Sequence, residues 1–182
     1  MTDTGTYEPN PTRWPGVCWN HVAREIAREV EQRHRVFPER VMRGQMTQAE
    51  ANHQIAVFEA LTQDVARIIA NRAHHPPAHH FTRKARIDAL LRERDYRRRR
   101  FPKWVSAGQI AQDQATHRSH CIEILLNALD QGLDFDPNSD DIKALCRTYG
   151  LRWYSLEERQ NLGPPYWSEQ LECVASGIVA LS

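Results

Sequence analysis

The chain has 182 residues, enough for one domain with a proper core or for two small units that share one. Its 24 lysines and arginines nearly cancel its 23 aspartates and glutamates, so the overall charge points to no class of partner. No apolar run approaches the roughly 18 to 20 residues of a membrane span, and the first residues lack the basic and apolar regions of a secretory signal. We therefore expect a cytoplasmic protein with no membrane association.

The charge is nevertheless unevenly distributed along the chain. Residues 83–103 hold ten basic and three acidic side chains, a net charge of +7. Residues 130–172 hold nine acidic and four basic side chains, a net charge of −5. The protein is therefore bipolar along its sequence.

The cysteines form no C-x-x-C pair, so the sequence indicates neither a zinc knuckle nor a disulfide scaffold. They are Cys18, Cys121, Cys146 and Cys173. Cys121 and Cys146 lie in apolar patterns, which are typical of small buried side chains.

Residues 1–18 contain several prolines and glycines and predict a mobile N-terminal arm, with Trp14 and Trp19 attaching its end to the core. Residues 19–73 predict a first helical hairpin. Its first helix carries apolar residues at helical spacing, and this apolar stripe keeps its phase through Pro38. Continuity of phase favours one long helix kinked at Phe37–Pro38 over two separate helices.

The turn of this hairpin is marked by Gly44, and Thr47 and Glu50 predict a capping box for the return helix. Residues 74–82 form a linker of histidines and prolines. Residues 83–131 repeat the plan of the first hairpin, with Gly108 at the turn. Ala111 stands where the capping threonine would be, so the second return helix should begin less stably, by about 1 kcal/mol.

The two hairpins are copies of one element. A shift of 64 residues aligns residues 28–61 with residues 92–125 without a gap, which indicates an internal duplication. The identical pairs are Arg28/Arg92, Glu29/Glu93, Arg33/Arg97, Arg35/Arg99, Phe37/Phe101, Pro38/Pro102, Val41/Val105, Gly44/Gly108, Gln45/Gln109, Gln48/Gln112, Ala51/Ala115, His53/His117, Glu59/Glu123 and Leu61/Leu125.

Residues 132–182 lie beyond the duplication and form an acidic segment with helical patterns of its own. The predicted fold is therefore all-α: two pseudo-symmetric kinked helical hairpins plus a C-terminal helical segment. Either one shared core or two lobes is compatible with the 64-residue period.

The second hairpin contains the strongest candidate for a binding site, the basic stretch between residues 94 and 104. Arginines and lysines there would contact phosphates, and aromatic side chains would stack on bases. The predicted partner-binding residues are Arg94, Tyr96, Arg98, Arg100, Lys103 and Trp104.

Some arginines of this stretch have a structural alternative. Arg33, Arg35, Arg97 and Arg99 occur in both copies, and repeated residues more often serve the shared packing. We expect them to pair with glutamates such as Glu29, Glu93, Glu59 or Glu123. Arg98 and Arg100 lack that explanation and are the better candidates for a partner surface.

Histidines offer a second candidate site. Imidazoles suit transition metals, and the linker holds His74, His75, His79 and His80. A proline-bearing loop without a cysteine or carboxylate is a poor preformed site, so neither a metal nor another cofactor is predicted. His53 and His117, matched between the copies, are expected either to pack structurally or to approach each other.

No catalytic motif is present. The sequence has no G-x-S-x-G elbow and no glycine-rich phosphate loop. Its paired carboxylates, Asp140–Asp141 and Glu157–Glu158, have simpler roles at a helix N-terminus and on a solvated face. We therefore predict that the protein is not an enzyme.

The repeated motif R-x-R-x-F-P-x-x-V-x-x-G-Q-x-x-Q-x-x-A, at residues 33–51 and less faithfully at residues 97–115, resembles a helical motif of small tailed-phage and prophage proteins. The resemblance covers about 70 residues of the chain, and Ala111 departs from the usual capping residue. It implies a small accessory protein in a bacterial host cell, acting by binding.

Two functions follow as hypotheses. The first is a non-catalytic phage-type protein that inhibits or redirects a host protein, such as a nucleic-acid-handling defence or replication factor, its acidic segment mimicking a nucleic-acid backbone. The alternative is direct binding of DNA or RNA through the basic helix from Arg94 to Lys103. A zinc-dependent role for the histidine linker is a third, weaker alternative.

Overall fold

The structure, a computed structural model, describes residues 9–70, 79–130 and 147. This part of the chain forms four helices, α1 (Trp19–Met42), α2 (Gln48–Ile69), α3 (Arg83–Ser106) and α4 (Gln112–Asp130). No strand occurs among the described residues, so the all-α prediction is confirmed. The predicted C-terminal helical segment, with its acidic side chains, lies outside the described residues apart from Arg147.

Each pair of helices forms a hairpin closed by a glycine. Gly44 and Gly108 adopt φ angles of 66° and 67°. These angles lie in the left-handed region, which costs glycine less free energy than any residue with a side chain. The N–H of the following residue then donates to a carbonyl of the last helical turn: Gln45 to Arg40 over 2.9 Å, and Gln109 to Trp104 over 2.8 Å. The predicted stops at both glycines are confirmed, and the two copies end their first helices in the same way.

Helices α1 and α3 each run without interruption through a proline. Pro38 lies inside α1 and Pro102 lies inside α3, both in the last two turns of their helices. The prediction of one continuous helix through Phe37 and Pro38 is therefore confirmed. The next helices begin only after the glycine turns.

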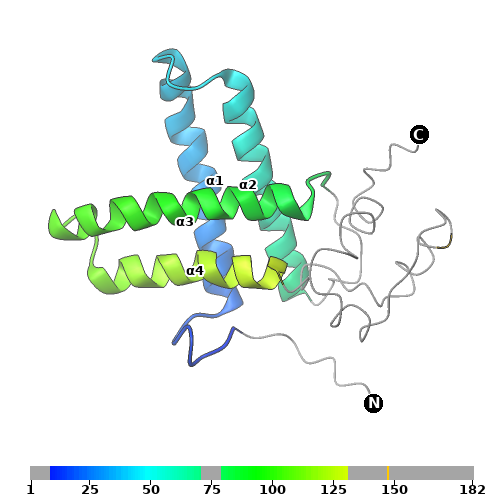
Figure 1. Cartoon of the computed structure of the whole chain (residues 1–182), viewed down its shortest axis with the longest axis vertical. Coiled ribbons are helices and arrows are strands. Elements are labelled where there is room, and N and C mark those ends of the chain that lie inside the picture. The colour runs from blue at the N-terminus through cyan, green and yellow to red at the C-terminus, as the bar shows by residue number, and fades with distance from the viewer. Residues whose placement is uncertain (1–8, 71–78, 131–146, 148–182) are drawn as a thin grey trace.

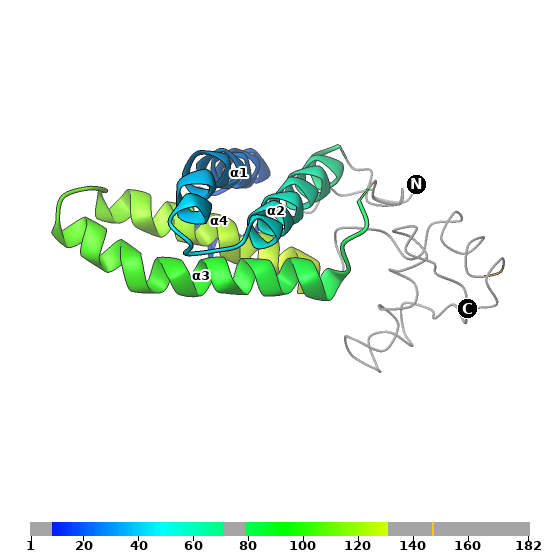
Figure 2. The same ribbon diagram turned by 90° about the horizontal axis from the view of Figure 1, so that it is seen from above.

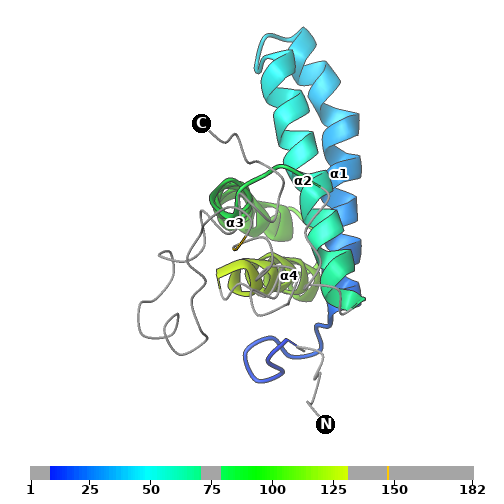
Figure 3. The same ribbon diagram turned by 90° about the vertical axis from the view of Figure 1, so that its right-hand side faces the viewer.

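The two hairpins cross each other. The α3/α4 hairpin lies across the α1/α2 hairpin, and the two glycine turns point in different directions (Figure 1). The views from above and from the side show the same crossing (Figures 2 and 3). Outside the hairpins, α1 packs mainly against α4, and α2 packs mainly against α3.

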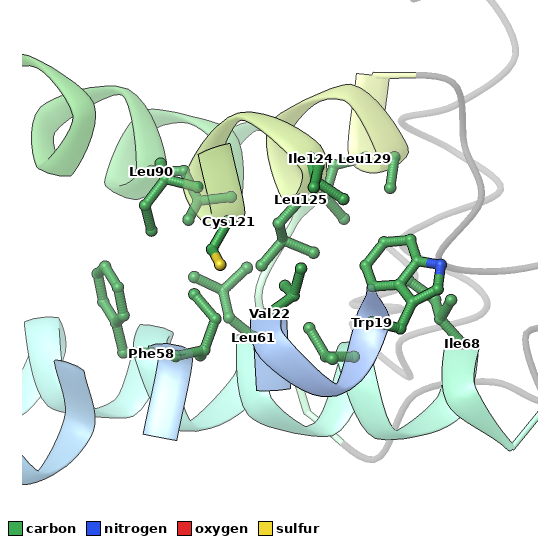
Figure 4. Packing of buried hydrophobic residues seen from close by; sticks show 14 of the residues in the cluster. Trp19, Val22, Phe58, Leu61, Ile68, Leu90, Cys121, Ile124, Leu125 and Leu129 are labelled. Carbon is green, nitrogen blue, oxygen red and sulfur yellow. The ribbon is translucent and has the colours of Figure 1, made fainter. Parts of the chain in front are cut away.

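A single hydrophobic core fills the crossing. Side chains from all four helices meet there, among them Val22, Leu61, Leu90 and Leu125, each without exposed surface (Figure 4). Of the two arrangements compatible with the repeat, the structure therefore has one shared core. Trp14 is 1% exposed in the same cluster, so the end of the N-terminal arm is attached to the core as expected.

The buried side of α3 differs from the prediction. The apolar pattern of residues 83–106 predicts that Ile87, Leu91, Trp104 and Val105 face inward. Each is only partly buried, although Ile87 still packs against the core. The helix instead buries a row of charged residues together with Ala89, Leu90 and Phe101. The buried charged residues of α3 are Arg83, Arg86, Glu93 and Arg97.

Among the described residues, none of the helices has the length and apolar character needed to cross a bilayer.

Candidate functional site

A buried arginine–glutamate network joins α1, α3 and α4 beside the hydrophobic core. Its centre is Arg97, whose side chain is 2% exposed and contacts three carboxylates. Its Nη2 donates to Glu25 over 2.7 Å and to Glu29 over 2.6 Å, and its Nε donates to Glu93 over 2.8 Å. The members of the network are Glu25, Glu29, Arg33, Glu93, Arg97 and Arg118.

The centre of this network follows the 64-residue repeat. Arg33 pairs with Glu29 on its own helix over 2.6 Å and with Glu93 on the other hairpin over 2.9 Å. Arg97, the repeat equivalent of Arg33, pairs with Glu93 on its own helix and with Glu29 on the other hairpin. Each copy therefore supplies the partner that the other copy needs.

Two members fall outside the repeat. Glu25 corresponds to Ala89 in the second copy, and Arg118 corresponds to Gln54 in the first. Arg118 Nε donates to Glu25 over 2.9 Å, so these two residues add one further carboxylate and one further guanidinium. These six residues hold three of each charge, and the half-exposed Arg28 adds a fourth guanidinium at Glu25 over 2.8 Å.

Glu29 and Arg97 are held in their charged forms by their neighbours in the network. Burial alone would raise the pKa of Glu29, but the charges of Arg97 and Arg33 and their hydrogen bonds outweigh burial and hold the pKa below its ordinary value. Burial would lower the pKa of Arg97, whereas the carboxylates of Glu29, Glu93 and Glu25 raise it above its ordinary value. The network is thus suited to hold the hairpins together rather than to exchange protons.

Sequence reasoning found this network only in part. The pairing expected for Arg33 and Arg97 is confirmed, with Glu29 and Glu93 as the partners. The expectation was wrong for Arg35, which is exposed and donates to Gln32. It was also wrong for Arg99, which is exposed and donates to the carbonyl of Asp95.

A usable signal for the network was the spacing E-x-x-x-R, present at 29–33 and again at 93–97, which places opposite charges one helical turn apart. Arg35 and Arg99 lie two residues farther along, on the solvent side of their helices. Nothing in the sequence pointed to Glu25 or Arg118.

The predicted partner-binding residues of α3 fall on two flanks of the helix. Tyr96, Arg100, Lys103 and Trp104 share one flank, because they are spaced three, four, seven and eight residues apart. The Arg100 guanidinium lies 5.8 Å from the centre of the Tyr96 ring, and the Tyr96 and Trp104 rings meet edge to face at 6.3 Å.

Arg94 and Arg98 lie on the other flank, beside Asp95. Arg94 Nε is 3.4 Å from the Asp95 carboxylate, and Arg98 Nη1 is 3.9 Å from it. Part of their positive charge is therefore compensated locally, even though the Arg98 side chain is 61% exposed. The structure brings together four of the six predicted residues and separates these two.

Arg92 and Arg99 extend the first flank, since they stand one turn before Tyr96 and one turn before Lys103. Both are exposed. Neither is among the six predicted partner-binding residues, although Arg99 lies within the predicted basic helix from Arg94 to Lys103. Within the described residues, no carboxylate forms an ion pair with the cations of this surface. We call the surface formed by Arg92, Tyr96, Arg99, Arg100 and Lys103 the basic face of α3.

Two grooves border the arginine–glutamate network, and both are lined by Glu29, Gln32, Glu93 and Tyr96. The first groove, of about 240 Å³, continues along α1 past Phe37 and Arg40.

The second groove, of about 340 Å³, continues along α3 past Phe101 and Trp104, which are the repeat equivalents of Phe37 and Arg40. The grooves therefore correspond to each other, and the second carries a tryptophan where the first carries an arginine.

A second buried ion cluster surrounds Asp64, which has no exposed surface. Arg86 Nη1 donates to one of its carboxylate oxygens over 2.7 Å, and His79 Nε2 lies 2.9 Å from the other. His79 therefore contacts α2 through Asp64. His74 and His75 lie outside the described residues.

The matched histidines do not approach each other. His53 contacts the ring of Phe81 at 5.6 Å, whereas His117 contacts His21 edge to face at 4.8 Å. Burial, and then the neighbouring charges of His117 and Arg24, lower the pKa of His21. Across the described ranges no group of three or more metal-ligating side chains is positioned to hold an ion.

Cys18 and Cys121 are free thiols, and the other two cysteines lie outside the described residues. Burial, reinforced by the charge of Glu25, raises the pKa of Cys121 to about 12. Cys121 is therefore a neutral, buried thiol at physiological pH, as its apolar pattern predicts.

Comparison with known proteins yields no match to a family model, a curated protein or a solved structure.

Proposed function

We propose that the protein is a non-catalytic nucleic-acid-binding protein that contacts the phosphate backbone through the basic face of α3. The observation that carries this proposal is the contrast between the buried arginines of α3 and the exposed cations of its basic face. Arg86 and Arg97 are buried and neutralised by carboxylates. Arg92, Arg99, Arg100 and Lys103 are exposed, and no ion pair to a described carboxylate neutralises them.

The geometry of this face suits an extended polyanion. Arg92 and Lys103 are eleven residues apart on one helix, which corresponds to about 16 Å along the helix axis. Like charges held this close repel each other, and phosphates would relieve that repulsion while releasing their own counterions. The exposed Tyr96 ring adds a stacking surface in the middle of the face.

The phage-type inhibitor of a host protein stays a prediction. Its supporting feature was the acidic segment after residue 130, which lies outside the described residues. A protein with an acidic surface would meet the same basic face through complementary charge. The experiment below separates the two kinds of partner.

The test is fluorescence anisotropy of labelled DNA across a salt series. We expect the protein to bind DNA at low salt. The logarithm of the association constant should fall linearly with the logarithm of the salt concentration, because neutralising phosphates releases their counterions. The double variant R100E/K103E should weaken binding to all sequences and reduce the salt slope by about 1 for each phosphate that the protein no longer neutralises.

The matched control is R35E/R43E, which makes the same change of charge on exposed residues of the first hairpin. This control should leave the salt slope within error of the wild type. Absence of binding at low salt would contradict the proposal and would direct attention to an acidic protein partner.

A further inference from the structure

The second groove opens beside the basic face of α3 and has an aromatic wall. Tyr96, Phe101 and Trp104 all line it. Tyr96 is 41% exposed, and its ring meets Trp104 edge to face, with 74° between the ring planes. An aromatic surface that is open to solvent within a groove of about 340 Å³ is suited to receive another flat ring.

Apart from Ile110, the remaining walls of this groove are polar. The side chains of Gln32 and Gln109 line it from opposite hairpins, and amides can both donate and accept hydrogen bonds. Arg28 and Arg118 line it as well, each paired with Glu25, and the Arg100 guanidinium lies 5.8 Å from the centre of the Tyr96 ring. The carboxylates on its floor, Glu29 and Glu93, are neutralised by the network and present little net negative charge.

The first groove provides an internal comparison. It has the same floor, but Arg40 stands in place of Trp104 and Val36 stands in place of Arg100. Tyr96 and Arg92 line the first groove as well, but its wall at Phe37 lacks the tryptophan. The two copies therefore differ at the positions that would recognise a planar, phosphate-linked group.

We infer that the second groove accepts one unpaired nucleobase, stacked against Tyr96 and Trp104, so that the nucleic acid bound by this protein is single-stranded. This inference rests on the proposed function, since the basic face supplies the contacts to the neighbouring phosphates. Bases of a duplex are stacked and paired within the helix, and unstacking one of them costs free energy. A single strand offers its bases at little cost and stacks them on aromatic side chains.

The test compares three labelled probes of equal length in anisotropy titrations: a short oligothymidylate, a duplex, and an oligonucleotide of abasic sugar–phosphate units. The oligothymidylate should bind the wild-type protein about tenfold or more tightly than the abasic probe, because only the former can fill the groove. This comparison needs no variant, so it does not depend on the folding of a mutant.

Tyr96 lines both grooves, so the variant that tests the second groove by itself is Trp104→Ala. It should lose most of the preference for the oligothymidylate over the abasic probe, whereas Trp104→Phe should keep that preference within about twofold, since a phenylalanine ring still stacks. Arg40→Ala alters the repeat equivalent of Trp104 in the first groove, and it should leave the ratio between the two probes unchanged.

The outcomes separate the inference from the proposed function. Equal, salt-dependent binding of all three probes would overturn base insertion and leave backbone binding in place. Loss of the preference in Arg40→Ala but not in Trp104→Ala would also overturn it. Binding of none of the probes would overturn the proposed function and the inference together.

Discussion

Arg97 and Arg99 lie in different environments, although each has an identical counterpart in the first copy of the repeat. Arg97 is surrounded by Glu25, Glu29 and Glu93, while Arg99 faces solvent. The difference follows from their two-residue separation, which places them on well-separated sides of one helix. Repetition alone therefore does not distinguish a structural arginine from an available one.

We predict that Arg97→Ala lowers the free energy of unfolding by about 3 to 5 kcal/mol, because it leaves buried carboxylates without their partner. Arg99→Ala serves as the matched control and should change the same quantity by less than about 0.5 kcal/mol. Urea denaturation followed by circular dichroism measures both. Similar effects of the two substitutions would contradict the structural role given to Arg97.

A pH dependence follows from Glu29. Its pKa is lower in the folded protein than the 4.5 expected for an unperturbed glutamate. Its stabilising contribution is therefore fully present above about pH 4.5 and is lost as the pH falls through the folded value. Unfolding measured by urea at a series of acidic pH values should show this loss.

Glu29→Gln should reduce the steepness of that acid dependence, because the neutral amide has no proton to gain. Glu31→Gln changes an exposed glutamate of the same helix and should leave the dependence as it is in the wild type. An unchanged slope in Glu29→Gln would show that other carboxylates dominate the response to acid.

At the scale of elements, the two return helices begin differently. The Thr47 hydroxyl accepts a hydrogen bond from the N–H of Glu50 over 3.1 Å, and the Glu50 carboxylate accepts one from the N–H of Thr47 over 2.7 Å. This confirms the predicted capping box of α2. Ala111, at the equivalent place before α4, has no side chain that could accept such a bond.

We predict that Thr47→Ala destabilises the protein by about 1 kcal/mol and that Ala111→Thr stabilises it by a similar amount. The pair is informative because the substitutions exchange the caps of two equivalent helices. Thermal unfolding measures both shifts. A destabilising Ala111→Thr would mean that the second hairpin starts its return helix by some other geometry.

Apolar periodicity predicted α2 and α4 well, because their buried sides are mainly hydrophobic. It also located α1, although that helix buries Glu25, Glu29 and Arg33. It failed on α3, where the buried side combines Leu90 and Phe101 with four charged residues. A hydrophobic pattern always predicts that a charged side chain faces solvent. Such a side chain is buried only where partners on other helices neutralise it. Those partners lie 60 to 72 residues away for the main contacts of Arg33 and Arg97.

The candidate site was predictable to the same limited degree. The basic stretch was evident from the sequence, and so was the presence of Tyr96 and Trp104 within it. The division into a buried row, a compensated flank and an exposed basic face depends on how α3 crosses the first hairpin. The sequence of α3 by itself does not indicate how the two hairpins cross.

At the scale of the whole molecule, the hairpins share one core and one ion network. Core residues from α1 and α2 pack directly with residues of α3 and α4, and Arg33 and Arg97 bridge the same interface. Neither hairpin buries its own apolar side without the other. We therefore expect the two hairpins to unfold together in one transition.

Leu61→Ala tests this coupling from the first hairpin. Leu61 has no exposed surface, and its truncation should lower the free energy of unfolding by about 2 to 5 kcal/mol. Native-state amide hydrogen exchange should then accelerate in the slowest amides of α4 by the same factor as in those of α2. Faster exchange confined to α1 and α2 would show that the hairpins open independently.

The contact between Trp14 and α4 has a consequence for synthesis of the protein. The Trp14 indole donates to Glu123 over 3.4 Å, across 109 positions of the chain. A ribosome adds residues at roughly 5 to 20 per second, so the first hairpin spends several seconds outside the exit tunnel before its partner emerges. During that interval Glu25, Glu29 and Arg33 are exposed on the nascent chain. A second copy of the protein, made by a neighbouring ribosome on the same messenger RNA, carries the complementary charged residues of α3 and α4.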